Sequence, residues 1–146
     1  MAMTLSEAWE LSRGDSGLAL VSTLRADQTI QASLVNTGIV TRGEPVLAFV
    51  TYGKVKLANL RARPQLTVAF RNGWQWAAVE GRAELAGPDD PRDGLDAEGL
   101  RLLLREIFTA AGGTHDDWEA YDRTMVEQGR TAVLITPTRV YSNAPA

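Results

Sequence analysis

The sequence predicts a mainly β (α+β) fold, a closed or nearly closed antiparallel barrel of five to seven short strands with flanking helices. Short apolar segments rich in strand-forming residues alternate with tight turns between residues 17 and 85. Two segments with apolar residues at helical spacing follow, over 96–111 and 116–128. No internal repeat, low-complexity tract or long linker interrupts the 146 residues, so we expect a single domain over residues 1–146.

The first half of the chain is predicted to hold two helices and three strands. These elements are a helix over 4–12, strands over 17–24, 29–37 and 46–52, and a helix over 54–63. The first helix begins at Thr4, which has the spacing of a capping box with Glu7. The first two strands flank a short polar turn and so form a hairpin. The segment Gly38–Glu44 is expected to be a loop, and Pro64 ends the second helix.

The second half is predicted to add a hairpin, two helices and one or two closing strands. These elements are strands over 65–71 and 74–85, helices over 96–111 and 116–128, and strands at 132–135 and 140–141. Asn72-Gly73 is the expected turn of the hairpin, and Gly81 is expected to mark a bulge in its long second strand. Pro137 is expected to interrupt the final strand, because proline cannot donate to a strand ladder.

The charges are distributed unevenly along the chain. Fifteen Lys and Arg against 18 Asp and Glu give a formal net charge of -3, which argues against a nucleic-acid-binding protein. Residues 42–71 nevertheless hold six bases and one acid, and are therefore a candidate site for a compact anion. Residues 84–127 hold twelve acids and four bases and are typical of a solvated acidic face. An N-terminus without a basic run and an apolar stretch too short to span a membrane favour a cytoplasmic protein with no membrane partner.

Residues for side-chain catalysis are scarce. The chain has no Cys and one His, so we expect no thiol nucleophile and no metal site. His115 stands at a predicted helix start, where a capping or surface role is the simplest interpretation. The acidic pair Asp116 and Asp117 suits the same helix start, because the helix dipole favours carboxylates there. No nucleophile elbow, phosphate loop or dinucleotide glycine motif is present, so we expect no catalytic side chain.

The most informative stretch is the turn from the third strand into the second helix. Lys54 and Lys56 follow Gly53 at the predicted helix start, although the helix dipole disfavours cations at that end. A bound anion would explain the choice, because free backbone N–H groups and two ammonium groups would converge on it. The alternative is a pair of solvated surface lysines.

Two further segments have a structural and a functional interpretation. Gln31, Ser33 and Val35 alternate with apolar side chains along the second strand, as ordinary in-out alternation or as a wall for a flat heteroaromatic ring. Trp74 and Trp76 are expected to share one strand face, as core or subunit-interface residues or as ring-stacking residues.

Several motifs together resemble the pyridoxamine-phosphate-oxidase-like split β-barrel family. Residues 54–64 (KVKLANLRARP) resemble its basic–Asn-Leu-Arg–Pro motif, and residues 73–85 resemble its Val-x-Gly-x-Ala strand. Residues 115–126 resemble the late helix of its actinobacterial branch, and Val140-Tyr141 resembles its closing strand. The similarity extends from Gly17 to Tyr141 and is greatest for the F420/flavin-dependent oxidoreductase group B.

The resemblance implies a six- to seven-stranded split β-barrel of the FMN-binding type, a homodimer with two cofactor sites at the subunit interface. Members bind FMN or the deazaflavin coenzyme F420, and a few bind haem. By position, Lys54 and Lys56 match the basic pair that grips the cofactor phosphate. Lys54 stands where members often have Arg, and Arg61 and Arg63 are candidates for the replacement charge. The expected cofactor-binding residues are Gln31, Ser33, Leu34, Val35, Thr51, Lys54, Lys56, Asn59, Trp74 and Trp76.

The function implied is that of an oxidoreductase, which uses reduced F420 to transfer a hydride to an electron-poor conjugated small molecule. The cofactor would carry the chemistry, so the scarcity of catalytic side chains fits this role. Trp74, Trp76 or Tyr52 would wall the substrate pocket. The alternatives are an FMN-binding oxidoreductase of the same fold and a non-catalytic protein that binds a flavin, a deazaflavin or haem. An FMN-dependent oxidase of a vitamin B6 phosphate ranks lower, because we find no second basic cluster for a substrate phosphate.

Overall fold

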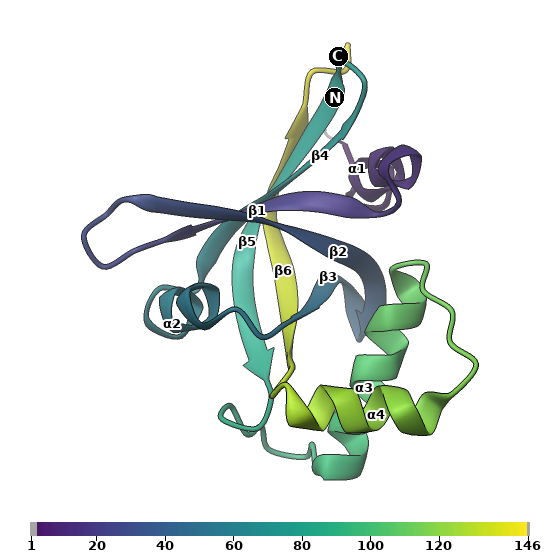
Figure 1. Cartoon of the computed structure of the whole chain (residues 1–146). Helices are drawn as coiled ribbons and strands as arrows, with labels where there is room; N and C mark the ends of the chain where they lie inside the picture. The colour runs from purple at the N-terminus through teal and green to yellow at the C-terminus, as the bar shows by residue number, and fades with distance from the viewer. Residues whose placement is uncertain (1–2, 146) are drawn as a thin grey trace.

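In the computed structural model, which describes residues 3–145, six antiparallel strands close into a barrel (Figure 1). The strands are β1 (Leu18–Leu24), β2 (Ile30–Arg42), β3 (Glu44–Thr51), β4 (Gln65–Asn72), β5 (Gln75–Ala86) and β6 (Thr131–Ser142). Their order around the barrel is β1-β2-β3-β6-β5-β4, and β4 pairs with β1 to close it. The predicted antiparallel barrel with flanking helices is therefore confirmed.

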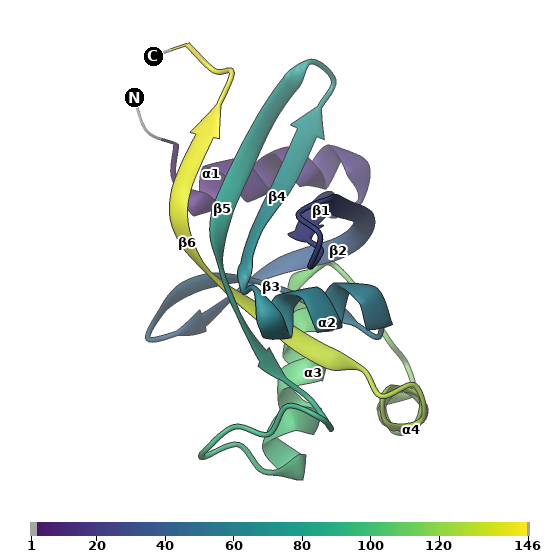
Figure 2. The ribbon, with the colours of Figure 1, turned by 90° about the vertical axis from the view of Figure 1, so that its left-hand side faces the viewer.

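Four α-helices and a 3-10 segment surround the barrel. They are α1 (Leu5–Glu10), η1 (Leu11–Asp15), α2 (Lys54–Ala62), α3 (Ala97–Ala110) and α4 (Trp118–Glu127). Figures 1 and 2 show α3 and α4 together at one end of the barrel, with α2 beside the strands. The capping box between Thr4 and Glu7 is confirmed, and the helix that it begins continues as a 3-10 segment beyond Glu10. Within residues 3–145, none of the helices has the length and apolar character needed to cross a membrane.

Two apolar clusters hold the molecule together, and β3 contributes to both. Leu47 and Phe49 point into the barrel interior, where they are fully buried. Val46 and Ala48 point outward and pack against α3 and α4. Since β3 is buried on both faces, its apolar residues run without alternation. Burying a side chain such as Phe49 contributes about 1.5–3 kcal/mol to folding.

The second strand is longer than the sequence predicts. The expected loop at 38–44 is wrong, because β2 continues to Arg42 and only Gly43, with a φ of 78°, turns the chain into β3. Gly38 permits this continuation, since a Cβ there would lie 2.5 Å from the backbone of Ala110. The close approach of α3, rather than flexibility, explains this glycine.

The last strand also continues through its apparent break. β6 is one strand over Thr131–Ser142, so the expected interruption at Pro137 is wrong. Pro137 lies opposite Gly81, where the register between β5 and β6 shifts, and the predicted bulge at Gly81 is confirmed. A bulge tolerates the missing proline N–H, because the ladder is already disrupted there.

Candidate functional site

A pocket of about 510 Å³ lies where the middle of β2 and the end of β3 meet the first turn of α2 and the α3–α4 pair. The three helices that contribute lining residues, α2, α3 and α4, lie in the lower half of Figure 1. Its polar side chains are those of Asn36, Thr51, Tyr52, Lys56, Tyr121 and Arg130. No Asp or Glu lines this pocket, although the chain as a whole is acidic. The lining therefore carries two positive charges and no negative one.

Lys56 is the buried cation of this pocket. Its residue is only 6% exposed, and its Nζ donates to Thr51 Oγ1 at 3.3 Å. The ammonium also lies 5.6 Å from the centre of the Phe49 ring. Burial lowers the pKa of Lys56, and no carboxylate among the described residues offsets this effect. A buried ammonium with one hydroxyl partner is costly by itself, so the arrangement favours an anion in the pocket.

The start of α2 adds backbone donors beside Lys56. Gly53 is the N-cap residue, and it offers no side chain to the free N–H groups of the first turn. The first turn contains no acidic residue. Lys54 is exposed and does not line the pocket, so the structure places only Lys56 of the predicted basic pair inside it. An anion at this helix start would meet both the ammonium group and the free amides.

The predicted strand residues divide into two groups. Leu34 and Val35 line the pocket as expected, together with Asn36. Gln31 instead accepts a hydrogen bond from Thr23 Oγ1 at 3.0 Å, and Asn59 Nδ2 donates to the same Thr23 oxygen at 3.0 Å. This network joins α2 to the β1–β2 hairpin, which gives Gln31 and Asn59 a positioning role.

Ser33 lies on the same inward-facing side of β2 as Gln31. Its Oγ is buried, and no hydrogen-bond partner is found for it among residues 3–145. It does not line the pocket, so its expected contact with a cofactor stays a prediction.

The two tryptophans lie far from the pocket of their own chain. Trp74 is in the β4–β5 turn and is 94% exposed, so the expected shared strand face is wrong. Trp76 is on β5 and packs edge-to-face on Tyr141 at 6.1 Å between ring centres. Figure 2 shows this turn at the opposite end of the barrel from α3 and α4, which line the pocket. The turn forms after Asn72 because Gly73 adopts a φ of 62°.

The helical wall of the pocket was missed by the sequence reasoning. Ile107 and Phe108 on α3, with Tyr121 and Met125 on α4, line its apolar side. Their helical spacing predicts only that they pack in the core, and no feature of the neighbouring sequence indicates a cavity beside them. Burial raises the pKa of Tyr121 to about 12, and its hydroxyl donates to the Leu104 carbonyl at 3.0 Å. Tyr121 is therefore neutral at neutral pH, and its hydroxyl hydrogen is engaged by the Leu104 carbonyl.

The arginines proposed as replacement charge are used elsewhere. Arg61 makes two hydrogen bonds to Asp90, at 2.6 and 2.8 Å. Arg63 Nε donates to the Leu24 carbonyl at 2.9 Å. Neither lines the pocket, so neither adds to its charge, and their expected contact with a cofactor stays a prediction.

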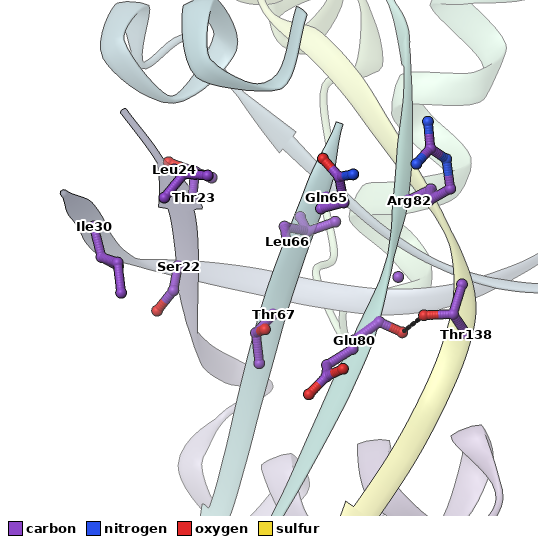
Figure 3. Close-up of a pocket in the computed structure, with 11 residues that line it drawn as sticks. Ser22, Thr23, Leu24, Ile30, Gln65, Leu66, Thr67, Glu80, Arg82 and Thr138 are labelled. Carbon is purple, nitrogen blue, oxygen red and sulfur yellow. Dashed lines mark hydrogen bonds between the residues drawn. The ribbon is translucent and has the colours of Figure 1, made fainter. Parts of the chain in front are cut away.

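A second, shallower groove of about 380 Å³ lies on the barrel wall (Figure 3). Its side chains come mainly from β1, β4, β5 and β6, and the Thr138 hydroxyl donates to the Glu80 carbonyl at 3.1 Å (Figure 3). The groove carries the Glu80 carboxylate as well as Arg82, so its charges offset one another. The pocket at Lys56 is therefore the better anion site.

Comparison with known proteins agrees with this fold. The family model described as Pyridoxamine 5'-phosphate oxidase matches residues 5–144. A conserved hypothetical protein of Mycobacterium tuberculosis is 18% identical, with a TM-score of 0.67 over 97% of this chain and 85% of that one. A protein described as F420 reductase is 17% identical, with a TM-score of 0.63 over 97% and 98%. A pyridoxamine 5'-phosphate oxidase-related, FMN-binding protein of Nostoc punctiforme is 14% identical, with a TM-score of 0.64 over 97% and 86%. At these identities the solved structures show a shared fold.

Proposed function

Because the chain belongs to the pyridoxamine 5'-phosphate oxidase family, we propose that it is an oxidoreductase that binds reduced coenzyme F420 and transfers a hydride to an electron-poor conjugated small molecule. One observation carries this proposal, the buried Lys56 in a pocket without acidic residues. The shared fold with proteins described as an F420 reductase and as FMN-binding supports the cofactor class. FMN is the alternative cofactor for the same pocket.

The residues present fit a cofactor with a phosphate and a flat ring. The Lys56 ammonium and the free amides of α2 would hold the phosphate, because both favour an anion. The Leu34–Asn36 segment of β2 would border the ring, and Phe108 and Met125 would exclude water from it. The protein would bind and orient the reactants, and the hydride would come from the reduced deazaflavin when it is bound. No carboxylate or histidine lines the pocket, so solvent would deliver the proton.

We further propose that the protein is a homodimer and that each cofactor site is completed at the subunit interface. The outer barrel face carries a row of cross-strand partners, and these are Leu34, Leu20, Ala69, Ala78 and Tyr141. Leu34 is 65% exposed and Leu20 is 45% exposed, which favours burial against another subunit. Trp76 lies beside Tyr141, so a second copy would supply the ring-stacking tryptophan that this chain's own pocket lacks.

The test is titration of the purified protein with F420 and with FMN, together with a dimer mass measurement. We expect Lys56→Ala to weaken cofactor binding about ten- to a hundredfold, because a charge-assisted phosphate contact contributes about 1.5–3 kcal/mol. Lys54→Ala is the matched control, since Lys54 lies on the same turn but is exposed, and we expect a smaller loss. Absence of binding to both cofactors would refute the proposal.

Turnover separates the enzyme from a protein that only binds its cofactor. Oxidation of reduced F420 is followed by absorbance after addition of a quinone or an enone. Multiple turnovers per site that Lys56→Ala slows would support the oxidoreductase. Tight binding with no oxidation of the cofactor by any acceptor would favour a non-catalytic binding protein.

A further inference from the structure

Arg130 is fixed at the edge of the pocket by the end of α4. Gly129, with a φ of 61°, ends the helix, and its N–H donates to the Val126 carbonyl at 3.1 Å. The Arg130 N–H donates to the Met125 carbonyl at 3.0 Å, which completes a Schellman motif. Thr131 then pairs with Thr51 of β3. Arg130 is thus held one residue before the strand pair that carries the hydroxyl partner of Lys56.

The guanidinium of Arg130 is oriented but only partly satisfied. Its Cζ lies 4.0 Å from the centre of the Tyr52 ring, and its Nε donates to Gln128 Oε1 at 2.8 Å. Among residues 3–145, Nε is the one guanidinium nitrogen of Arg130 with a hydrogen bond, and no carboxylate lies within ion-pair distance of this guanidinium. Stacking on an aromatic ring holds a guanidinium in one plane and leaves its outer donors free for a ligand.

Seven other arginines form ion pairs within the protein, unlike Arg130. Those within 4 Å of a carboxylate are Arg13, Arg42, Arg61, Arg92, Arg101, Arg105 and Arg139. Arg130 resembles Lys56 instead, because both cations contact an aromatic ring and an uncharged polar group. Both line one pocket without an acidic residue. Two like charges in one cavity repel each other, and an anion between them converts that repulsion into attraction.

We infer that Arg130 is the second cation of the anion-binding end of this pocket, and that it donates its free terminal N–H groups to the phosphate that Lys56 neutralises. The inference rests on the proposed function, since the phosphate is the cofactor's. The planar guanidinium can bind two phosphate oxygens at once, whereas a lysine supplies only a point charge. Arg130 therefore provides the charge that Lys54, Arg61 and Arg63 do not bring to the pocket.

The test compares Arg130→Gln with the matched variant Arg123→Gln. Arg123 is exposed on α4 and does not line the pocket, so its substitution removes the same charge without touching the site. We expect Arg130→Gln to raise the dissociation constant for FMN about tenfold or more and to leave that for riboflavin, which has no phosphate, within about twofold. Arg130→Lys should restore part of the loss. Equal FMN affinities for Arg130→Gln and Arg123→Gln would overturn the inference.

A second measurement separates this inference from the proposed function. Inorganic pyrophosphate is added to each variant without cofactor, and the midpoint of thermal unfolding is recorded. We expect pyrophosphate to raise the midpoint of the wild type and of Arg123→Gln, and to raise that of Arg130→Gln less. This result would support the role of Arg130 even if neither F420 nor FMN binds, an outcome that would refute only the proposed function. An equal response of all three proteins, or none, would count against Arg130. Parallel titration with F420 distinguishes its phosphodiester from the phosphate monoester of FMN.

Discussion

The α3–α4 surface and the Lys56 pocket use their cations in opposite ways. On the helices, Arg101 and Arg105 both reach Asp122, at 3.2 and 2.5 Å. The hydrogen bond from Arg105 lowers the pKa of Asp122, and Arg101 adds to the effect. In the pocket, Lys56 and Arg130 have no carboxylate partner among the described residues. The difference shows that the net charge of a stretch of sequence does not reveal which cations are free to bind a ligand. Many basic side chains already form ion pairs with Asp or Glu in the folded protein.

The largest loss of stability is expected from a substitution that forces α3 away from β2. Gly38→Val places a side chain against the backbone of Ala110 and Ala111, with a Cβ at 2.5 Å, so α3 cannot stay against β2. We expect the free energy of unfolding to fall by about 3 kcal/mol. Cofactor binding should fall with it, because α3 forms one wall of the pocket. Denaturant unfolding measures the change, and Thr41→Val, at an exposed site of the same strand, is the control. An unchanged midpoint for Gly38→Val would show that the packing is looser than the structure indicates.

The next largest effect is expected at the ion-paired cluster of Arg101, Arg105 and Asp122. Asp122→Asn removes the shared partner of Arg101 and Arg105, and we expect the free energy of unfolding at neutral pH to fall by about 1–2 kcal/mol. Because the folded pKa of Asp122 lies below its ordinary value of 3.8, its contribution is present above that pH and is lost as the pH falls through the folded pKa. The difference from wild type should therefore shrink in acid. Asp116→Asn, at a fully exposed carboxylate, is the control and should have little effect. A similar loss in both variants would contradict the special role of Asp122.

In the pocket, removal of a charge is expected to raise the free energy of unfolding rather than lower it. Lys56→Met removes a buried charge without an ion-pair partner but keeps most of the apolar stem, so the cofactor-free protein should become about 1 kcal/mol more stable. Cofactor affinity should fall in the same variant. Thermal and denaturant unfolding without ligand give the stability, and Lys54→Met at the neighbouring exposed lysine should be close to neutral. A destabilised Lys56→Met with normal binding would make Lys56 a structural residue.

The smallest effect is a dependence on alkaline pH. Burial lowers the pKa of Lys56 from its ordinary value of 10.5, so just below pH 10.5 the unfolded chain binds more protons than the folded one. The free energy of unfolding of the wild type should therefore rise with pH in that window relative to Lys56→Met. The stability difference between the two proteins, measured from pH 7 to pH 10, should narrow as the pH rises. A constant difference would show that Lys56 is solvated in the folded protein.

Much of the fold could be predicted from local signals. The capping box at Thr4 and the end of α2 before Pro64 depend on backbone preferences of a few adjacent residues, and both occur. The hairpin turn between β4 and β5 also occurs, although its two turn residues are Gly73 and Trp74, one position later than the predicted Asn72-Gly73. The predictions at Gly38 and Pro137 were wrong because glycine and proline commonly interrupt strands when only the local sequence is considered. Contacts with α3 and with the bulge at Gly81 decide their actual conformations.

The candidate site was predictable only in part. Thr51, Lys56, Leu34 and Val35 line one pocket, as the motif resemblance implied for a cofactor site, although their contact with a cofactor stays a prediction. Trp74 and Trp76 do not line it, since pairing of β4 with β5 carries them to the other end of the barrel.

The sequence by itself determined the strand and helix types, the helix start at Lys54 and Lys56, and the excess of positive charge around them. These properties follow from the spacing of apolar residues and from turn and capping chemistry, which act over a few residues. Only the tertiary structure decided that Lys56 is buried, that Arg61 forms an ion pair with Asp90, and that Arg130 lines the pocket. The reason is physical: Arg130 reaches Tyr52 because β6 pairs with β3, and burial and ion pairing depend on segments that are distant along the chain.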